Sequence, residues 1–207
     1  MIPSTIAVYG PDTRKSDVSN NDIKNPTSYY GCNKVLLENL GNYYRINHNV
    51  DFRSLRITGV ISPEKYAYNG STDYATEIFF KARKKEHYNI CLKSSTRLPM
   101  AYIDDVIDGT MQLLEAPKDN LTVGTYNMNC VDFSPLELYT EVKKYYPELT
   151  VDYKPDIRDT MANSWPHHYD DTSSRNDWGW NPKYDTLEKL VKIMYDNTSF
   201  KTNETKI

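Results

Sequence analysis

The sequence predicts an α/β protein. Short apolar segments typical of buried strands alternate with segments whose apolar residues recur at helical spacing. Such alternation is typical of parallel strand–helix–strand units, and no internal repeat or low-complexity block interrupts it. At 207 residues, of which 39% are hydrophobic, the chain is long enough for one domain with a core, or for a domain plus a smaller lobe.

Strands and a long helix are predicted in the first part of the chain. A short apolar run ends at Gly10, and a polar loop then leads to a helix from about Ser28 to Asn47. Residues 51–57 alternate enough for a buried strand. The spacing of apolar residues in the helix predicts one buried face, formed by Leu36, Leu37, Leu40, Tyr43 and Tyr44.

Two helices are predicted in the middle of the chain. The first is capped within residues 71–73. An extended segment over residues 98–103 follows, after which Asp104 and Asp105 stand where the cap of the second helix is needed. Pro117 ends this second helix, whose predicted apolar face consists of Val106, Ile107, Met111 and Leu114.

The last third of the chain holds the sharpest local signal. Residues 134–137, Ser-Pro-Leu-Glu, form a capping box with proline at the first helical position, which predicts a helix ending at Pro147. A final helix is expected from about Thr186 to Asp196. The polar tail, residues 196–207, is expected to be disordered.

Charge and hydropathy argue against several classes of partner. The formal net charge of −3, with both signs interspersed, is unlike the basic surfaces that bind DNA or RNA, so no nucleic-acid partner is expected. The nearest basic run, residues 81–85, fits the solvated end of a helix. The chain has no apolar stretch of about 18 residues and no charged leader, so we expect neither membrane association nor a secretory signal.

Cysteine and histidine spacing gives no sign of a metal site. Cys32, Cys91 and Cys130 are odd in number and share no disulfide or zinc-binding spacing. The adjacent His167 and His168 have no second ligand cluster to support them. We therefore expect no bound metal and a reduced, intracellular setting.

Tyr30 and Lys34 are the first candidates for chemistry. Their separation of four residues, at the start of the predicted long helix, puts both side chains on one face. A nearby ammonium favours the phenolate and lowers a tyrosine pKa from about 10 toward the working range. Tyr30 can then take a proton from an alcohol while hydride leaves for a cofactor, and Lys34 can donate to ribose hydroxyls. Among 18 tyrosines, however, the spacing alone is a weak signal.

Two further motifs strengthen this interpretation. Ser4-Thr5 lies 25 residues upstream, on a strand-like segment that runs into Val8-Tyr9-Gly10, and Arg56-Ile57-Thr58-Gly59 ends the next predicted strand. A hydroxyl residue before a Val-Tyr-Gly turn, then Tyr-Gly-x-x-Lys, then Arg-x-x-Gly is the pattern of the extended short-chain dehydrogenases. The chain resembles that family in all three motifs and in their order.

Within that family, the sequence resembles the L-threonine 3-dehydrogenase branch over residues 2–195. The segments that carry this likeness are Pro3-Ser-Thr-Ile-Ala, Ser71-Thr-Asp-Tyr-Ala75, Thr96-Arg-Leu-Pro-Met100 with Tyr102-Ile-Asp-Asp105, Ser164-Trp-Pro166, and Asp170-Asp171 followed by Asp177-Trp-Gly-Trp180. The resemblance implies NAD as cofactor and oxidation of the β-hydroxyl of L-threonine to 2-amino-3-oxobutanoate. It also implies a homodimer of full-length subunits.

The resemblance assigns roles to the residues of the three motifs. Ser4 and Thr5 are expected to contact the substrate. Thr5 and Tyr30 would bracket the threonine hydroxyl and, with Lys34, form the catalytic group. Tyr30, Lys34 and Val60 are expected to contact the nicotinamide riboside.

Thr72 and Trp165 are implied to line the substrate pocket. From the residues alone, Thr72 is equally well explained as a helix cap and Trp165 as a core side chain. Trp178 and Trp180 fit packing better than catalysis. The chain departs from the family pattern at Thr58, where proline usually precedes the glycine beside the nicotinamide, and we expect a looser cofactor fit there.

The resemblance implies the C-terminal part of a Rossmann-type doubly wound parallel sheet with a small α/β substrate-binding lobe. Residues 1–62 would be the remnant of the NAD-binding domain with the catalytic helix, and residues 63–195 the lobe mixed with the remaining Rossmann elements. No two of the eight glycines lie closer than ten positions, so the glycine-rich turn that receives the pyrophosphate cannot form. We expect a truncated or degenerate gene whose product alone neither binds NAD tightly nor oxidises threonine.

Two other functions remain open. A nucleotide-sugar epimerase or dehydratase of the same superfamily commonly carries an asparagine where Ile57-Thr58 offers none. The chain could instead be a catalytically inactive interaction module that pairs with full-length subunits through the long helix. Zinc-dependent threonine dehydrogenases are excluded because their Cys and His ligand clusters have no counterpart. The sequence does not decide between a mitochondrial and a cytoplasmic location.

Overall fold

The computed structural model describes residues 1–64 and 70–200, and it confirms the predicted α/β class. Three parallel strands form the first sheet, in the order β1 (Ile2–Thr5), β2 (Ser54–Ile57) and β6 (Thr125–Asn127). β1 pairs with β2 from its first residue to its last, and β2 continues the ladder to β6. β1 and β6 are therefore the two opposite edges of this sheet.

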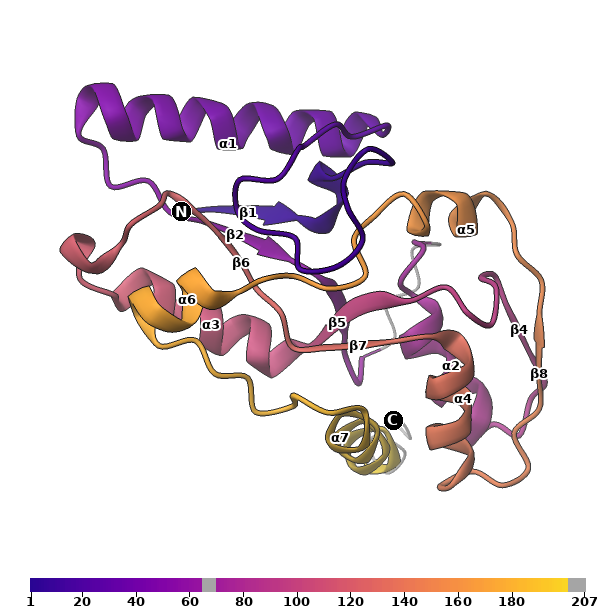
Figure 1. Cartoon of the computed structure of the whole chain (residues 1–207). Coiled ribbons are helices and arrows are strands. Elements are labelled where there is room, and N and C mark those ends of the chain that lie inside the picture. The colour runs from indigo at the N-terminus through magenta and orange to yellow at the C-terminus, as the bar shows by residue number, and fades with distance from the viewer. Residues whose placement is uncertain (65–69, 201–207) are drawn as a thin grey trace, which may run out of the picture.

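Helices cover both faces of the first sheet (Figure 1). The long helix α1 (Tyr29–His48) lies along one face, and α3 (Ile103–Glu115) and α6 (Thr172–Trp178) lie on the other. The strand β1 runs directly into a short 3-10 turn, η1 (Ile6–Val8), whose residues are all buried. The first turn of α1 packs against η1, so the start of the helix and the end of the strand meet.

Two smaller sheets form the second part of the molecule. In one of them, β5 (Leu98–Tyr102) is central, with β3 (Gly59–Ile61) parallel to it and β7 (Val131–Phe133) antiparallel. The other pairs β4 (Tyr88–Ile90) with β8 (Val151–Tyr153) in parallel. Only Thr58 separates the end of β2 from the start of β3, so the chain passes directly from the first sheet into the second.

The helices of this second part enclose the largest core. They are α2 (Tyr74–Arg83), α4 (Pro135–Lys143), α5 (Ile157–Ala162) and α7 (Leu187–Phe200), and a short 3-10 turn, η2 (Lys118–Asn120), precedes β6. Apolar side chains from all four helices and from the strands meet there and are fully buried, among them Ile78, Phe79, Leu98, Met100, Leu138 and Leu190.

The predicted capping box is confirmed at the start of α4. The Ser134 hydroxyl accepts a hydrogen bond from the Glu137 amide at 3.3 Å, and the Glu137 carboxylate accepts one from the Ser134 amide at 2.7 Å. Pro135 is the first helical residue, as predicted. The helix ends at Lys143, before the predicted end at Pro147.

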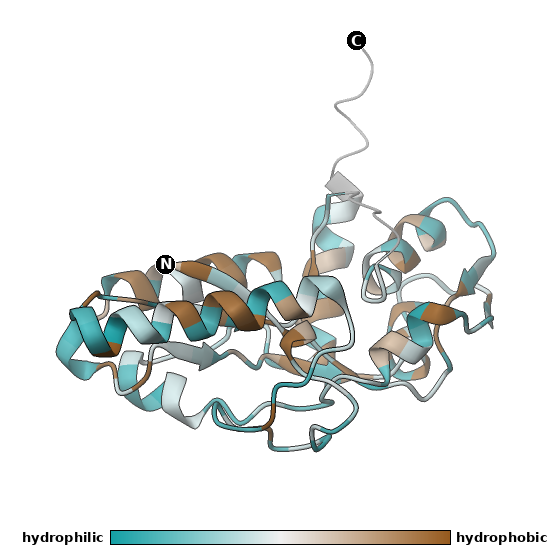
Figure 2. Ribbon diagram, turned by 90° about the horizontal axis from the view of Figure 1, so that it is seen from above, coloured by the Kyte–Doolittle hydropathy of each residue, from teal (hydrophilic) through white to brown (hydrophobic). Residues whose placement is uncertain are grey.

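The predicted buried face of α1 is wrong, although the helix itself is confirmed. Four of the five residues assigned to that face are exposed: Leu36 (61%), Leu40 (47%), Tyr43 (52%) and Tyr44 (45%). The helix instead turns Gly31, Glu38 and Gly41 to the protein. A Cβ on Gly41 would lie 2.1 Å from the Phe52 ring, so glycine is needed where the helix backbone meets this ring. Hydrophobic residues remain visible along α1 in Figure 2, which looks down on this helix.

The predicted apolar face of α3 is also wrong. Three of its four residues are exposed: Ile107 (52%), Met111 (48%) and Leu114 (44%). Val106, Gly109 and Leu113 face the sheet, and the glycine accommodates Trp180, whose ring would lie 2.6 Å from a Cβ there. In both helices, the residues that pack against the sheet include glycine. Glycine has no apolar side chain, so the spacing of apolar residues does not reveal this face.

Asp105 does not cap α3, contrary to expectation. The helix begins at Ile103, and the Asp105 carboxylate accepts hydrogen bonds from the amides of Lys183 and Tyr184 at 2.8 and 3.0 Å. It therefore holds the segment before α7 against α3. Desolvation by burial raises the pKa of this carboxyl, while the two backbone amides oppose the shift.

The C-terminal helix is longer than predicted. α7 continues to Phe200, so the expected disorder is wrong for residues 196–200, while residues 201–207 lie outside the described residues. The predicted packing role of Trp180 is confirmed: the side chain is 2% exposed and its indole N–H donates to the Asn129 carbonyl at 3.0 Å. The division of the chain at residue 62 stays a prediction.

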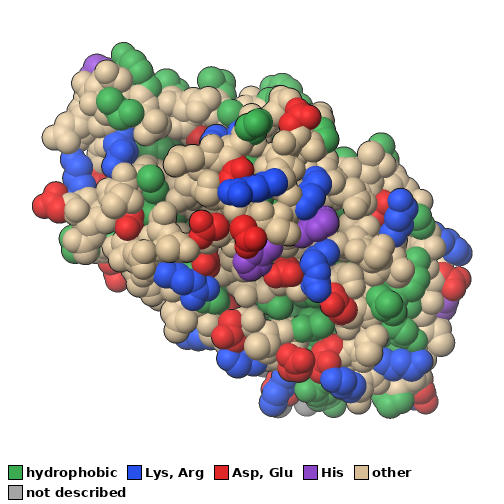
Figure 3. All heavy atoms as spheres, viewed as in Figure 1, with side chains coloured by type: hydrophobic (Ala, Val, Ile, Leu, Met, Phe, Trp, Pro, Cys, Tyr) green, Lys and Arg blue, Asp and Glu red, His purple; other side chains and the backbone are tan. Residues whose placement is uncertain are grey.

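The surface carries charges of both signs. On the face shown in Figure 3, acidic and basic side chains are interspersed and form no single-sign field. None of the helices within residues 1–64 and 70–200 combines the length and apolar character that crossing a membrane requires.

Candidate active site

Tyr30 and Lys34 lie on the first turns of α1 and face the same side. The helix begins after Ser28, whose hydroxyl accepts a hydrogen bond from the Gly31 amide at 3.0 Å. The Lys34 ammonium lies 5.5 Å from the centre of the Tyr30 ring and donates to the Pro3 carbonyl of β1 at 2.6 Å. Tyr30 is 53% exposed, so its phenol can be reached by a small molecule.

Gly31 allows this pair to lie at the end of β1. A Cβ on Gly31 would lie 2.0 Å from the Ala7 carbonyl oxygen, so only glycine lets the first turn of α1 approach η1 this closely. The Tyr-Gly-x-x-Lys motif thus has a physical reason for its glycine. The approach holds the residue next to Tyr30 against η1, the turn that Thr5 caps.

The structure separates the two adjacent hydroxyl residues, Ser4 and Thr5. Thr5 caps η1 by accepting a hydrogen bond from the Ala7 amide at 3.3 Å and is half-buried. Ser4 is buried, and its hydroxyl donates to the Glu38 carboxylate at 2.5 Å. Successive side chains of a strand point to opposite faces, so the two hydroxyls have different surroundings. In this structure the Ser4 hydroxyl serves Glu38, and its expected contact with the substrate stays a prediction.

Glu38 and Arg56 form a buried ion pair beneath α1. The guanidinium makes two hydrogen bonds to the carboxylate, from Nε at 2.9 Å and from Nη2 at 2.7 Å. The two side chains are 5% and 2% exposed, respectively. Arg56 Nη1 also donates to the Tyr9 hydroxyl at 2.9 Å and to Asn127 Oδ1 at 3.1 Å. The network ties α1 to all three strands of the first sheet, which fixes the helix that carries Tyr30.

Burial and pairing set the ionisation of this network. Burial alone lowers the pKa of Arg56, but the hydrogen bond to Glu38 and the neighbouring Tyr9 raise it above its ordinary range. Burial raises the pKa of Tyr9 to about 12, so this tyrosine stays protonated near neutral pH. The arginine of the Arg-x-x-Gly motif is therefore a structural cation. Sequence reasoning missed Glu38, because a carboxylate within an apolar helix stripe gives no sign of its partner 18 residues away.

A cavity of about 730 Å³ lies beyond the end of the first sheet, between β3, α2 and the start of α3. Val60 and Thr72, two of the predicted site residues, line it, together with Thr58 and Ile107. Tyr30, Lys34, Thr5 and Trp165 are not among its lining residues. The structure thus places the predicted residues in two groups, one around Tyr30 and one around Val60.

Gly59 brings β3 and Thr72 together. A Cβ on Gly59 would lie 2.3 Å from Met100 Sδ and 2.8 Å from Thr72 Cγ2. Thr72 does not cap α2, because the helix begins after Asp73, so the helix-cap alternative for Thr72 is wrong. Thr72 therefore packs against Gly59 and lines the cavity beside β3.

Trp165 lies away from this cavity. Its ring is partly buried and packs against two core clusters, the large one around Leu138 and a smaller one around Val8 and Tyr169. Its backbone carbonyl accepts a hydrogen bond from Lys15 at 3.3 Å. In this structure Trp165 joins two parts of the core.

The residues present fit the nicotinamide-riboside end of NAD. Thr58 lines the cavity and is 5% exposed, and its buried hydroxyl has no hydrogen-bond partner among the described residues, which leaves it for a polar ligand. Val60, 37% exposed, offers an apolar contact in the same cavity. Lys34 has three N–H donors and directs one to Pro3, which leaves two for ribose hydroxyls. No glycine-rich turn for the pyrophosphate occurs among the chain's eight glycines.

Potential metal ligands do not gather in the structure. Across residues 1–64 and 70–200, no three His, Cys, Asp or Glu side chains are placed to hold one ion. His168 instead pairs with Asp132, with 3.0 Å between Nδ1 and Oδ1. Burial, with the nearby Lys15, lowers the pKa of His167 below its ordinary value.

Known proteins resemble the chain over most of its length. The mitochondrial L-threonine 3-dehydrogenase of Bos taurus is 42% identical over 194 residues, which are 93% of this chain and 52% of the bovine protein. An uncharacterised epimerase/dehydratase of Staphylococcus haemolyticus is 43% identical over 93% of this chain and 61% of its own length. The chain thus spans about half to three-fifths of these curated relatives.

Solved structures that resemble the chain include L-threonine dehydrogenases as well. The crystal structure of L-threonine dehydrogenase from Phytophthora infestans matches 95% of this chain with a TM-score of 0.92 and 42% identity, and 64% of that protein is covered. The GalE-like L-threonine dehydrogenase of Cupriavidus necator matches with a TM-score of 0.92 and 38% identity, with 71% of that protein covered. The family model of the NAD dependent epimerase/dehydratase family matches residues 1–128, more than half of the chain. The chain therefore belongs to the NAD dependent epimerase/dehydratase family.

Proposed function

We propose that the chain carries the proton-transfer part of an NAD-dependent L-threonine 3-dehydrogenase site. The supporting observation is the pairing of Tyr30 with Lys34, whose ammonium donates to the Pro3 carbonyl of β1, and the close approach of Gly31 to η1, the turn that Thr5 caps. The 42% identity to the bovine enzyme of that name supports threonine as the substrate. The reaction would convert L-threonine to 2-amino-3-oxobutanoate.

In the proposed mechanism, the β-hydroxyl of threonine lies between Thr5 and Tyr30. Thr5 Oγ1 accepts the Ala7 amide, so its O–H is free to donate to the substrate oxygen. Tyr30 takes the hydroxyl proton as the C–O bond becomes a carbonyl, and the exposed phenol passes it to solvent. NAD, held through Lys34 and Val60, would supply the acceptor for the hydride of Cβ. Lys34 stabilises negative charge on the Tyr30 oxygen from one helical turn away.

The cavity beside β3 completes the proposed site. We assign Val60 to the nicotinamide side and Thr72 to the substrate side, because both line the same cavity. The proposal leaves out Ser4, whose hydroxyl is engaged by Glu38. Trp165 is also left out, because its ring packs in the core and does not line this cavity.

A chimera tests the proposed reaction. Residues 2–195 of this chain would replace the matching segment of the Cupriavidus necator enzyme, which supplies the remainder of its own chain. The chimera is expected to form NADH when L-threonine is added, measured by absorbance. L-Serine and a nucleotide sugar serve as substrate controls. A folded chimera, verified by circular dichroism, that forms no NADH with L-threonine would contradict the proposal.

The affinity of the chain itself for NAD is a separate expectation. Because its sequence holds no glycine-rich turn, we propose that the chain binds only the nicotinamide-riboside end, and hence binds NAD weakly. Isothermal titration calorimetry measures this directly. A dissociation constant in the micromolar range would contradict it.

We further propose that the exposed apolar stripe of α1, formed by Leu36, Leu40, Tyr43 and Tyr44, pairs two copies of the protein. These four large apolar side chains are between 45% and 61% exposed on one helix. Burying them against a second copy would remove their apolar surface from water, which is favourable. Light scattering is expected to give the mass of a dimer, and Leu40→Lys that of a monomer. Ile157→Lys, at another exposed apolar position, on α5, is the matched control. A wild-type monomer at all concentrations would contradict the pairing.

An intracellular location is also proposed. Cys32, Cys91 and Cys130 are all free, which fits a reducing compartment. The bovine and porcine relatives are named as mitochondrial proteins. Cell fractionation tests the location, and a secreted, disulfide-linked product would argue against it.

A further inference from the structure

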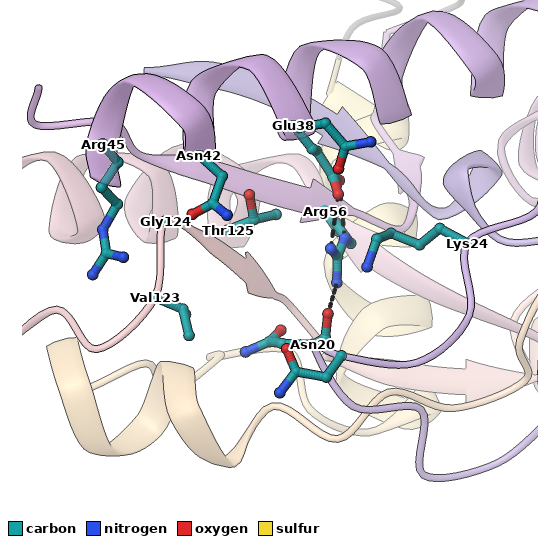
Figure 4. Close-up of a pocket in the computed structure, with 11 residues that line it drawn as sticks. Asn20, Lys24, Glu38, Asn42, Arg45, Arg56, Val123, Gly124 and Thr125 are labelled. Carbon is teal, nitrogen blue, oxygen red and sulfur yellow. Dashed lines mark hydrogen bonds and ion pairs between the residues drawn. The ribbon is translucent and has the colours of Figure 1, made fainter. Parts of the chain in front are cut away.

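A second cavity lies at the opposite edge of the first sheet from the Tyr30–Lys34 pair. It has a volume of about 240 Å³ and is enclosed by the loop at residues 20–24, the middle of α1 and the start of β6 (Figure 4). Asn42, on its wall, follows Tyr30 by twelve residues, about 18 Å along a helix that rises 1.5 Å per residue. This Lys24 cavity is therefore separate from the proposed active site.

The charges of the Lys24 cavity do not balance. Three cations, Lys24, Arg45 and Arg56, line it with one carboxylate, Glu38. Glu38 is fully engaged by Arg56 through two hydrogen bonds. Within residues 1–64 and 70–200, neither Lys24 nor Arg45 forms an ion pair. The carboxylate of Asp22, on the same loop as Lys24, is paired with an arginine at 2.7 Å.

The cavity also holds unused hydrogen-bond donors. In the described part of the chain, the amide groups of Asn39 and Asn42 make no hydrogen bond. Lys24 donates only to the Asp22 carbonyl, at 3.4 Å, and Arg45 uses one nitrogen for two backbone carbonyls. Figure 4 shows Lys24, Asn42 and Arg45 extending from the loop and from α1 toward the same hollow. Partial burial, with the charge of Arg56 next, lowers the pKa of Lys24, and these effects outweigh the opposing charges of Glu38 and Asp22.

We propose that the Lys24 cavity binds a small oxyanion, namely phosphate or the phosphate group of a small monoester. Lys24 and Arg45 would supply the two positive charges, and the Asn42 amide an uncharged donor. The hollow, of about 240 Å³, is large enough for a phosphate group with a few attached atoms.

Titration of the full chain with inorganic phosphate, against chloride at equal ionic strength, tests the proposal. Saturable binding is expected by calorimetry. Lys24→Met is expected to weaken it about tenfold or more, the usual effect of losing a charged hydrogen-bond partner. Lys84→Met, which removes the same charge from an exposed position at the end of α2, is the matched control and is expected to leave binding unchanged.

Two further measurements keep the test decisive. Asn42→Leu replaces an exposed side chain, so it is expected to preserve the fold while weakening phosphate binding, and it decides the matter if Lys24→Met does not fold. Glycerol phosphate identifies the source: tighter binding than phosphate indicates a monoester ligand, and weaker binding indicates the free ion. The proposal is overturned if phosphate does not bind saturably, or if a folded cavity variant, Lys24→Met or Asn42→Leu, binds it as well as Lys84→Met does.

Discussion

Replacing Glu38 by glutamine tests how α1 is held on the sheet. Glu38→Gln keeps the size of the side chain but removes its charge and one of its acceptor oxygens. The carboxylate accepts three hydrogen bonds, from Ser4 at 2.5 Å and from Arg56 at 2.9 and 2.7 Å. Arg56 is 2% exposed, so the substitution leaves its charge buried and uncompensated. Removing one partner of such a pair costs about 3–5 kcal/mol, a large part of the roughly 5–15 kcal/mol that stabilises a typical domain.

Urea unfolding, followed by circular dichroism and tryptophan fluorescence, measures this loss. The midpoint is expected to fall at an unchanged slope, because the native surface is the same. Glu115→Gln, at an exposed position of α3, is the matched control and should change the free energy of unfolding by less than about 0.5 kcal/mol. If Glu38→Gln costs less than about 1 kcal/mol, the pair does not anchor the helix in the way described.

Three further predictions concern packing, thiol reactivity and pH. Gly31→Ala places a Cβ 2.0 Å from a backbone carbonyl of η1 and is expected to cost about 1–3 kcal/mol in urea unfolding; an unchanged midpoint would contradict the close approach. Burial raises the pKa of the Cys130 thiol well above its ordinary value, so iodoacetamide should label exposed Cys32 first and Cys130 only after unfolding, as mass spectrometry would detect. Burial raises the pKa of Asp177, but hydrogen bonds from Thr122 and a neighbouring tyrosine lower it overall, so its contribution to stability is present above its unfolded pKa and is lost as pH falls through the lower folded pKa. Asp177→Asn should flatten the decline of the urea midpoint over that acidic range, and a decline as steep as in the wild type would refute it.

Local signals in the sequence predicted local structure well. The start of α1 after Ser28 and the capping box at Ser134 depend on residues within one turn of each other, and both are present in the structure. The faces of α1 and α3 were predicted wrongly because apolar spacing identifies a stripe but not what covers it. Gly41 and Gly109 mark the faces that pack, and only the positions of Phe52 and Trp180 explain why.

For the candidate site too, the sequence predicted local relations between residues but not contacts between distant ones. The spacing of Tyr30 and Lys34 is a property of one helix, so the sequence placed them together correctly. A strand of four residues does not disclose which of Ser4 and Thr5 faces the core, because that depends on Glu38 and Arg56. Trp165 could not be placed from the sequence either, since its packing joins clusters that are far apart along the chain.

The central claim is that Tyr30 transfers the proton, and one comparison in the chimera tests it most directly. Tyr30→Phe removes the phenol and keeps the ring, while Tyr29→Phe makes the same change on the adjacent residue, which is 85% exposed. We predict that Tyr30→Phe lowers kcat/KM for L-threonine by about 100- to 10,000-fold and that Tyr29→Phe leaves it unchanged. Equal activity of the two variants would contradict the proposed role of Tyr30.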